Sequence, residues 1–290
     1  MANDSPSGAT LRRLSPDEVL AGYDRVSALY PYVPPLSLWR AWECAAYAGH
    51  RLVEPVLDVG CGDGAFFRFL WPGIRRVVGV EADPAVARRA VASGVYERVL
   101  TVSASAIPRG EAGYGSAFAN CSLEHMSDLD GVLGGVHRAL VPGGRLLCSV
   151  VTDRFVAWLT VATLVARAAG PDRGEAVRRA YLRSHHLENP LPAEAWIARL
   201  SAAGFVVREH VPLLSEVTAR AFLGLDEVWH LSGADGTGGE MGRNLEAFLE
   251  RRPSFPSAFR HVLRGLLEME ADHDAACGAV FVAEKASPHR

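Results

Sequence analysis

The stretch Val56-Leu57-Asp58-Val59-Gly60-Cys61-Gly62-Asp63-Gly64 decides the fold of this chain. Its first half is an apolar segment of the kind that forms a buried strand, and its second half places glycine at alternate positions. Glycine has no Cβ, so such a turn folds tightly and lets the backbone approach a ligand. The apolar start of a helix follows at residues 65–71. Strand, glycine turn and helix together predict a ligand cradle at the carboxyl edge of an open α/β sheet.

Apolar segments of strand length recur along the chain and alternate with helical segments. Their composition is apolar almost throughout, as expected for parallel strands with both faces covered. The alternation predicts a doubly wound α/β fold. The expected strands are residues 55–60, 76–81, 98–103, 114–120, 145–151, 205–207 and 278–284.

The glycine pattern alone fits two classes of ligand. Gly60-x-Gly62-x-x-Ala65 also matches the looser dinucleotide fingerprint, which would indicate an NAD(P)-dependent oxidoreductase. Asp58 argues against that alternative, because a carboxylate beside a bound pyrophosphate would repel it. The absence of a recognisable second catalytic domain argues against it as well.

Three motifs in the same order resemble class I S-adenosylmethionine-dependent methyltransferases, in particular their type 11 branch. The first is residues 57–64, the second is Asn120-Cys121-Ser122-Leu123-Glu124-His125, and the third is Arg138-Ala139-Leu140-Val141-Pro142-Gly143-Gly144. The resemblance covers residues 52–152 well and 185–210 more loosely. It implies a Rossmann-like methyltransferase fold with a mostly parallel, seven-stranded sheet whose last strand is antiparallel.

The chain outside the core is predicted to be mostly helical. Helices in the first 50 residues would pack on the core or cover the active site as a lid, and two insertions would form a helical cap. The expected organisation is an N-terminal extension (1–50), an α/β core (51–152), a cap insertion (153–191), a core helix and strand (192–211), a second helical insertion (212–276) and a last core strand with a tail (277–290).

The resemblance implies S-adenosylmethionine as cofactor and S-adenosylhomocysteine as product. Asp58 would face the ammonium group of the methionine moiety. Glu81, at the end of the second strand, would accept hydrogen bonds from both ribose hydroxyls. Ser103 stands where the family usually has an acid for the adenine amino group, and a serine hydroxyl accepts a hydrogen bond without charge. The expected cofactor-binding residues are Asp58, Gly60, Cys61, Gly62, Gly64, Glu81, Ala82, Ser103, Ala104, Asn120 and Cys121.

Candidate catalytic residues are three histidines. A sulfonium methyl is already activated, so the enzyme has mainly to align a nucleophile and exclude water. A hydroxyl nucleophile also needs a base, and His125 follows the fourth strand, close to the expected methyl group. His185 and His186 precede a core helix and would face the substrate or pack in a loop. The histidines show no spacing with acids that indicates a metal site.

Bulk composition is that of a globular protein without a polyanion partner. The 290 residues are 49% hydrophobic and 22% charged, with a net charge of −3, so neither nucleic-acid binding nor an integral membrane segment is expected. Five scattered cysteines and a polar start predict a reduced, cytoplasmic protein. Monomer and homodimer are equally compatible with the sequence.

The function expected from the sequence is methyl transfer to a small-molecule acceptor. Trp158, Trp196 and Trp229, in or near the expected cap, favour a sizeable, partly apolar acceptor. O-methylation of a bacterial secondary metabolite or of a glycosylated or lipid-like intermediate is the first choice, because His125 could serve as base. The departure at Ser103 leaves open a non-catalytic methyltransferase-like binding protein.

Overall fold

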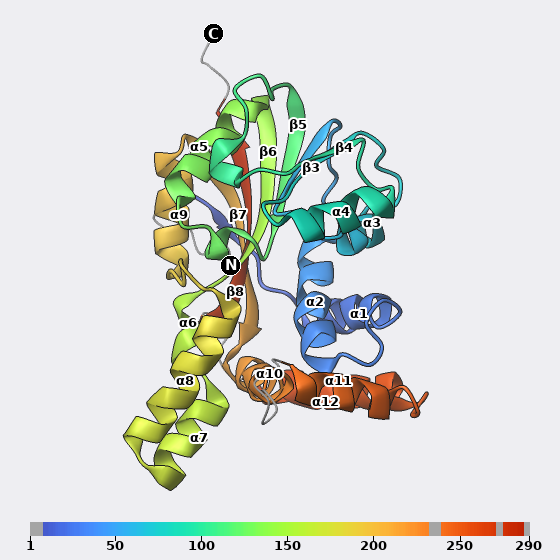
Figure 1. Cartoon of the computed structure of the whole chain (residues 1–290), viewed down its shortest axis with the longest axis vertical. Helices are drawn as coiled ribbons and strands as arrows, with labels where there is room; N and C mark the ends of the chain where they lie inside the picture. The colour runs from blue at the N-terminus through green and yellow to red at the C-terminus, as the bar shows by residue number, and fades with distance from the viewer. Residues whose placement is uncertain (1–7, 232–238, 271–274, 287–290) are drawn as a thin grey trace.

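The structure is a computed structural model of the chain, and it describes residues 8–231, 239–270 and 275–286. In this part of the chain the strands form one eight-stranded sheet in the order β1-β7-β8-β6-β5-β2-β3-β4, flanked by helices (Figure 1). The strands are β1 (Thr10–Leu11), β2 (Val56–Val59), β3 (Val77–Val80), β4 (Arg98–Leu100), β5 (Tyr114–Asn120), β6 (Leu140–Val151), β7 (Phe205–Ser215) and β8 (Ala276–Lys285).

The predicted doubly wound, mostly parallel sheet is confirmed, with one strand more than expected. β8 runs antiparallel to β6 and β7, whereas β5 and β2 pair in parallel with their neighbours. The additional strand is β1, in which Thr10 lies opposite Glu209 of β7 in a parallel pair. A two-residue edge strand has no hydrophobic periodicity, so the sequence pattern does not reveal it. β7 also continues to Ser215, beyond the boundary expected at residue 211.

The helices follow the order predicted from the sequence. The cap insertion holds three of them, and α7 and α8 extend away from the sheet (Figure 1). The helices are α1 (Pro16–Val26), α2 (Pro34–Tyr47), α3 (Ala65–Leu70), α4 (Pro84–Ser93), α5 (Leu129–Ala139), α6 (Asp153–Ala157), α7 (Thr160–Ala169), α8 (Pro171–His185), α9 (Ala193–Ala202), α10 (Glu216–Trp229), α11 (Glu240–Leu249) and α12 (Phe255–Met269). Short 3₁₀ turns lie at Ala104–Ala106 and Leu123–His125.

Two hydrophobic cores lie on opposite faces of the sheet. Leu146 and Cys148 pack with α5 and α9 on one face, whereas Leu147 packs with α2, α10 and α12 on the other. Adjacent residues of a strand point to opposite faces, so a strand that is buried on both sides must be apolar throughout. Trp196 of α9 is fully buried, and its indole Nε1 donates to the Val151 carbonyl oxygen at 3.1 Å.

The N-terminal helices are fixed against the body of the protein. Ser15 and Glu18 form a capping box at the start of α1. Gly22 of α1 lies against α2, where a Cβ would stand 2.1 Å from the Ala41 carbonyl oxygen. The Tyr23 hydroxyl donates to the Pro256 carbonyl oxygen of α12 at 2.9 Å. The extension therefore joins the second helical insertion beside the sheet (Figure 1).

Some of the expected segments fall outside the described residues. These are the first seven residues of the N-terminal extension, residues 232–238 and 271–274 of the second insertion, and the tail after residue 286. Among the described helices, none is long and apolar enough to cross a membrane.

Candidate active site

The glycine-rich turn follows β2 at the edge of the sheet. Gly60, Gly62 and Gly64 have φ values of +70°, +57° and +80°, a backbone region that favours glycine. A Cβ at Gly62 would meet nothing within 4 Å, so this part of the backbone faces open space. The Gly60 and Cys61 amides donate to the Val80 carbonyl oxygen at 2.8 and 3.0 Å, which ties the turn to β3.

Glu81 follows β3 and is held in place by the same turn. Its Oε2 accepts a hydrogen bond from the Gly62 amide at 3.2 Å, and its Oε1 accepts one from the Asp83 amide at 2.9 Å. Asp83 in turn caps α4 by accepting from the Ala85 and Val86 amides. The carboxylate of Glu81 is thus fixed at the edge of a cleft with acceptor capacity remaining on both oxygens.

A cleft of about 380 Å³ lies between the glycine turn and the segments that follow β3, β4 and β5. Its size is within the range of small-molecule sites. The Ser103 and Ser105 hydroxyls, 3.0 Å apart, give one wall a polar surface. The cleft is lined by six of the predicted cofactor residues: Gly60, Glu81, Ala82, Ser103, Ala104 and Cys121.

Asp58 lies beneath the turn and outside the lining of this cleft. The side chain is buried, and its Oδ2 accepts a hydrogen bond from the Tyr96 hydroxyl at 2.7 Å. Burial raises the pKa of Asp58 to about 7, although the Tyr96 hydrogen bond opposes the shift. The same tyrosine ring packs against Gly64, where a Cβ would stand 2.7 Å from it. Cys61, Gly62, Gly64 and Asn120 also lie outside the lining, so these residues shape the turn and the strand ends.

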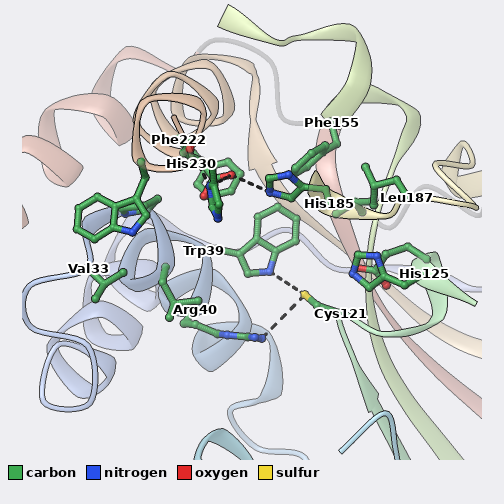
Figure 2. A pocket seen from close by; sticks show the side chains of 16 residues that line it. Val33, Trp39, Arg40, Cys121, His125, Phe155, His185, Leu187, Phe222 and His230 are labelled. Atoms are coloured by element: carbon green, nitrogen blue, oxygen red, sulfur yellow. Dashed lines mark hydrogen bonds and ion pairs between the residues drawn. The ribbon is translucent and has the colours of Figure 1, made fainter. Parts of the chain in front are cut away.

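A second cavity of about 340 Å³ adjoins the cleft, and the two share Cys121 and His125 (Figure 2). Its walls are mostly apolar and come from segments far apart in the sequence. Trp39 of α2, Phe155 of the cap insertion and Phe222 of the second insertion pack against one another, with ring centroids 5.3–6.3 Å apart. The N-terminal extension therefore supplies a wall of this cavity, and the two insertions supply others.

Buried polar groups lie where the two cavities meet. Cys121 has a φ of +47°, unusual for a residue with a side chain, and such outliers cluster at functional sites. Its thiol donates to Glu43 Oε1 at 3.1 Å, and the same oxygen accepts from the Trp39 indole at 2.9 Å. Arg40 forms an ion pair with Glu43, which is fully buried. The Asn120 side-chain amide lies 2.9 Å from the Tyr47 hydroxyl.

Glu124 places a carboxyl group in the apolar cavity. The side chain is only 1% exposed, and its Oε2 has no hydrogen-bond partner among the described residues. Burial raises the pKa of Glu124 to about 8, so the carboxyl is mostly protonated at neutral pH and has a proton to donate. In the sequence, Glu124 stands out only as part of the motif at residues 120–125.

His125, the predicted base, lines both cavities where they meet. Its Nδ1 lies 3.2 Å from the His186 carbonyl oxygen, and because a carbonyl only accepts, Nδ1 carries the proton of the neutral ring. Burial lowers the pKa of His125, which favours the neutral form. His186 contributes this carbonyl from a left-handed position at the end of α8, and its ring does not line the cavity.

His185 lines the apolar cavity together with two residues that the sequence analysis did not select. Its Nε2 lies 3.1 Å from Asp226 Oδ2, and Nδ1 of His230 lies 3.4 Å from the same oxygen. Tyr181 also donates its hydroxyl to Asp226. Asp226 of α10 and His230, the C-cap residue of that helix, are four residues apart, a spacing that places both on one side of the helix end. The spacing of Asp226 and His230 is visible in the sequence. The sequence does not show that His185 of α8 approaches them.

Comparisons with known proteins agree with this architecture. A family model described as "Methyltransferase domain" matches residues 37–210. The chain is 26% identical over 128 residues to a malonyl-[acyl-carrier protein] O-methyltransferase of Pseudescherichia vulneris, a match that covers 44% of this chain and 51% of that protein. It is 24% identical over 150 residues to a demethylmenaquinone methyltransferase of Symbiobacterium thermophilum, which covers 48% and 58%. The chain thus matches little more than half the length of these curated relatives.

Among solved structures, the cyclopropane synthase MmaA2 of Mycobacterium tuberculosis has a similar fold. The TM-score is 0.53 at 16% identity, and the alignment covers 93% of this chain and 98% of that one. Because the family model matches more than half of the chain, the chain belongs to the methyltransferase domain family.

Proposed function

We propose that this protein transfers the methyl group of S-adenosylmethionine to an oxygen atom of a small, partly apolar acceptor. The observation that carries the proposal is the junction of two cavities at Cys121 and His125. One cavity is polar and bordered by the glycine turn, and the other is apolar. A methyl donor and an acceptor held in adjoining cavities are positioned for direct transfer.

The polar cleft has the groups that an adenosine cofactor requires. Glu81 would accept hydrogen bonds from the ribose hydroxyls, because its two oxygens are already oriented by backbone amides. The backbone at Gly60, at the edge of the cleft, would approach the methionine part, and Ser103 would meet the adenine. S-Adenosylmethionine supplies a methyl group on a positively charged sulfur when bound. The protein residues hold it, orient it and exclude water.

The apolar cavity supports an acceptor with both apolar and polar parts. Trp39, Phe155 and Phe222 would bury the apolar part, and the Glu124 carboxyl offers a hydrogen bond to a polar group. Two of the similar proteins are named as acting on a malonyl-acyl-carrier protein and on demethylmenaquinone. An acceptor that joins a polar head to an apolar body fits this cavity.

His125 would serve as the base for a hydroxyl acceptor. Since the His186 carbonyl fixes the proton on Nδ1, the lone pair of Nε2 is available to take the hydroxyl proton. The acceptor oxygen would then form a bond to the methyl carbon as the carbon–sulfur bond breaks, and S-adenosylhomocysteine leaves.

The test is transfer of a ¹³C-labelled methyl group to a panel of amphiphilic alcohols, phenols, carboxylic acids and amines, with products assigned by NMR. We expect label on oxygen. We expect His125→Gln to lower kcat with alcohols by about 100-fold or more, the usual contribution of a general base, with unchanged affinity for S-adenosylhomocysteine. Label found only on nitrogen or carbon would overturn the assignment to oxygen.

A further inference from the structure

His185, Asp226 and His230 form a compact cluster on the wall of the apolar cavity. One candidate ligand atom from each residue lies within 4.8 Å of the other two. Two imidazoles and one carboxylate form a donor set that suits divalent first-row transition ions such as zinc, cobalt and iron. The cluster joins the cap insertion to the second insertion, and Figure 2 shows His185 and His230 beside the other cavity residues.

Hydrogen bonds outside the cluster fix its side chains. The His185 Nδ1 lies 3.1 Å from the Tyr181 carbonyl oxygen, and the His230 Nδ1 lies 2.9 Å from the Asp226 carbonyl oxygen. Because a carbonyl only accepts, both Nδ1 atoms carry protons, which leaves the Nε2 lone pairs for binding. The Tyr181 hydroxyl donates to the Asp226 carboxylate. Metal-binding histidines and carboxylates in proteins are oriented by such outer contacts.

The short distance between His185 and Asp226 requires a positive centre between them. Nε2 and Oδ2 are 3.1 Å apart, and two lone pairs at that distance repel each other. The centre is either a proton or a metal ion. With bonds of about 2.0–2.1 Å, two ligand atoms of a tetrahedral zinc ion lie about 3.3–3.4 Å apart, close to the observed distance. The candidate ligand atom of His230 lies within 4.8 Å of the other two.

One metal ion would account for the convergence of all three side chains. The rings of His185 and His230 have centroids 4.8 Å apart, and Asp226 contacts both of them. Phe155 and Phe222 line the same cavity, and an apolar surrounding strengthens the interaction of an ion with its ligands.

We propose that His185, Asp226 and His230 bind one divalent transition-metal ion on the wall of the acceptor cavity. Three protein ligands leave a coordination position open toward the cavity, as in zinc sites that bind substrates. Resting on the proposed function, the inference adds that this position takes an oxygen atom of the acceptor. It thereby defines the acceptor as a compound with a second metal-binding oxygen, such as a hydroxyacid or a diol.

The test is metal binding by the full-length protein after chelator treatment. We expect one equivalent of Zn²⁺ to bind in calorimetry. Co²⁺ should give the visible absorption of a cobalt site with histidine and carboxylate ligands. Asp226→Ala and His185→Ala should weaken Zn²⁺ binding by about 100-fold or more, since each removes a ligand directly and even outer contacts contribute 10–100-fold.

Two further variants keep the result interpretable. Asp226 is buried, and its replacement can unfold the cap, so His230→Asn at a half-exposed position is the second ligand variant. It should also weaken Zn²⁺ binding while circular dichroism stays unchanged. His261→Ala, an exposed histidine on α12, is the matched control and should bind Zn²⁺ like the wild type.

Absence of stoichiometric Zn²⁺ binding by the wild type would overturn the inference and identify the positive centre as a proton. Equal Zn²⁺ binding by the wild type and by all three ligand variants would show that the ion binds elsewhere. That result would also overturn the inference. S-adenosylhomocysteine binding is measured on the same samples and does not require these residues. A failure of Zn²⁺ binding can therefore be distinguished from a failure of the proposed function.

Discussion

At the scale of single residues, Glu81 has two tasks. Its carboxylate accepts hydrogen bonds from the Gly62 and Asp83 amides, and it lines the polar cleft that we propose as the cofactor site. Glu81→Ala should lower the affinity for S-adenosylhomocysteine by about 100-fold, since each hydrogen bond to a charged group contributes about 1.5–3 kcal/mol. Equilibrium dialysis measures the change. The exposed Glu97 provides the control variant Glu97→Ala, and a Glu81 variant with unchanged affinity would contradict the assignment.

The buried carboxyl group of Asp58 should make the stability of the protein depend on pH. Its folded-state pKa of about 7 lies above the ordinary aspartic acid value of 3.8, so folding favours the protonated form. Its contribution to stability is complete below the unfolded-state pKa and is lost as pH rises through 7. Between pH 5 and 7 the wild type should lose about 1.4 kcal/mol per pH unit relative to Asp58→Asn, which does not titrate. Urea unfolding at several pH values tests this, and parallel curves would contradict it.

At the scale of elements, α2 forms one wall of the apolar cavity, and α1 packs against α2. A Cβ at Gly22 would stand 2.1 Å from the Ala41 carbonyl oxygen, so Gly22→Ala must push the two helices apart. We expect a loss of about 1–3 kcal/mol in stability, typical of overpacking, and a higher KM for the acceptor with unchanged cofactor affinity.

Gly265 provides the matched control for that substitution. It also lies within a helix, α12, but a Cβ there would meet nothing within 4 Å. Gly265→Ala should therefore raise stability slightly, by up to about 1 kcal/mol from helix propensity. Thermal unfolding distinguishes the two substitutions. Equal effects at both positions would mean that the close contact of α1 with α2 is unimportant.

The elements themselves were largely readable from the sequence. The strand expected at residues 114–120 has the same bounds in β5, because both its faces are buried and its ends carry polar residues. The glycine turn was equally readable, since glycine spacing is a local pattern. The wall of the apolar cavity could not be predicted from the sequence. His185 and Asp226 come from different insertions, and no local periodicity records that α8 meets α10. Nor does the motif reveal that Tyr96 covers Asp58.

At the scale of the whole molecule, the insertions and the N-terminal extension add a second, apolar cavity beside the cleft at the edge of the sheet. The sheet provides the cleft beside Glu81, and the added helices provide Trp39, Phe155 and Phe222 around the second cavity. Binding in the two cavities should therefore be separable. Substitutions of the apolar wall should change acceptor binding and leave cofactor binding intact.

The most direct test of the account is a calorimetric titration of the wild-type protein with S-adenosylmethionine, S-adenosylhomocysteine and NADH. The account predicts one site with about micromolar affinity for the first two compounds, within the usual range for enzyme ligands, and no heat with NADH. Binding of NADH alone would contradict the assignment of the cleft, and binding of none of the three would contradict the proposed activity.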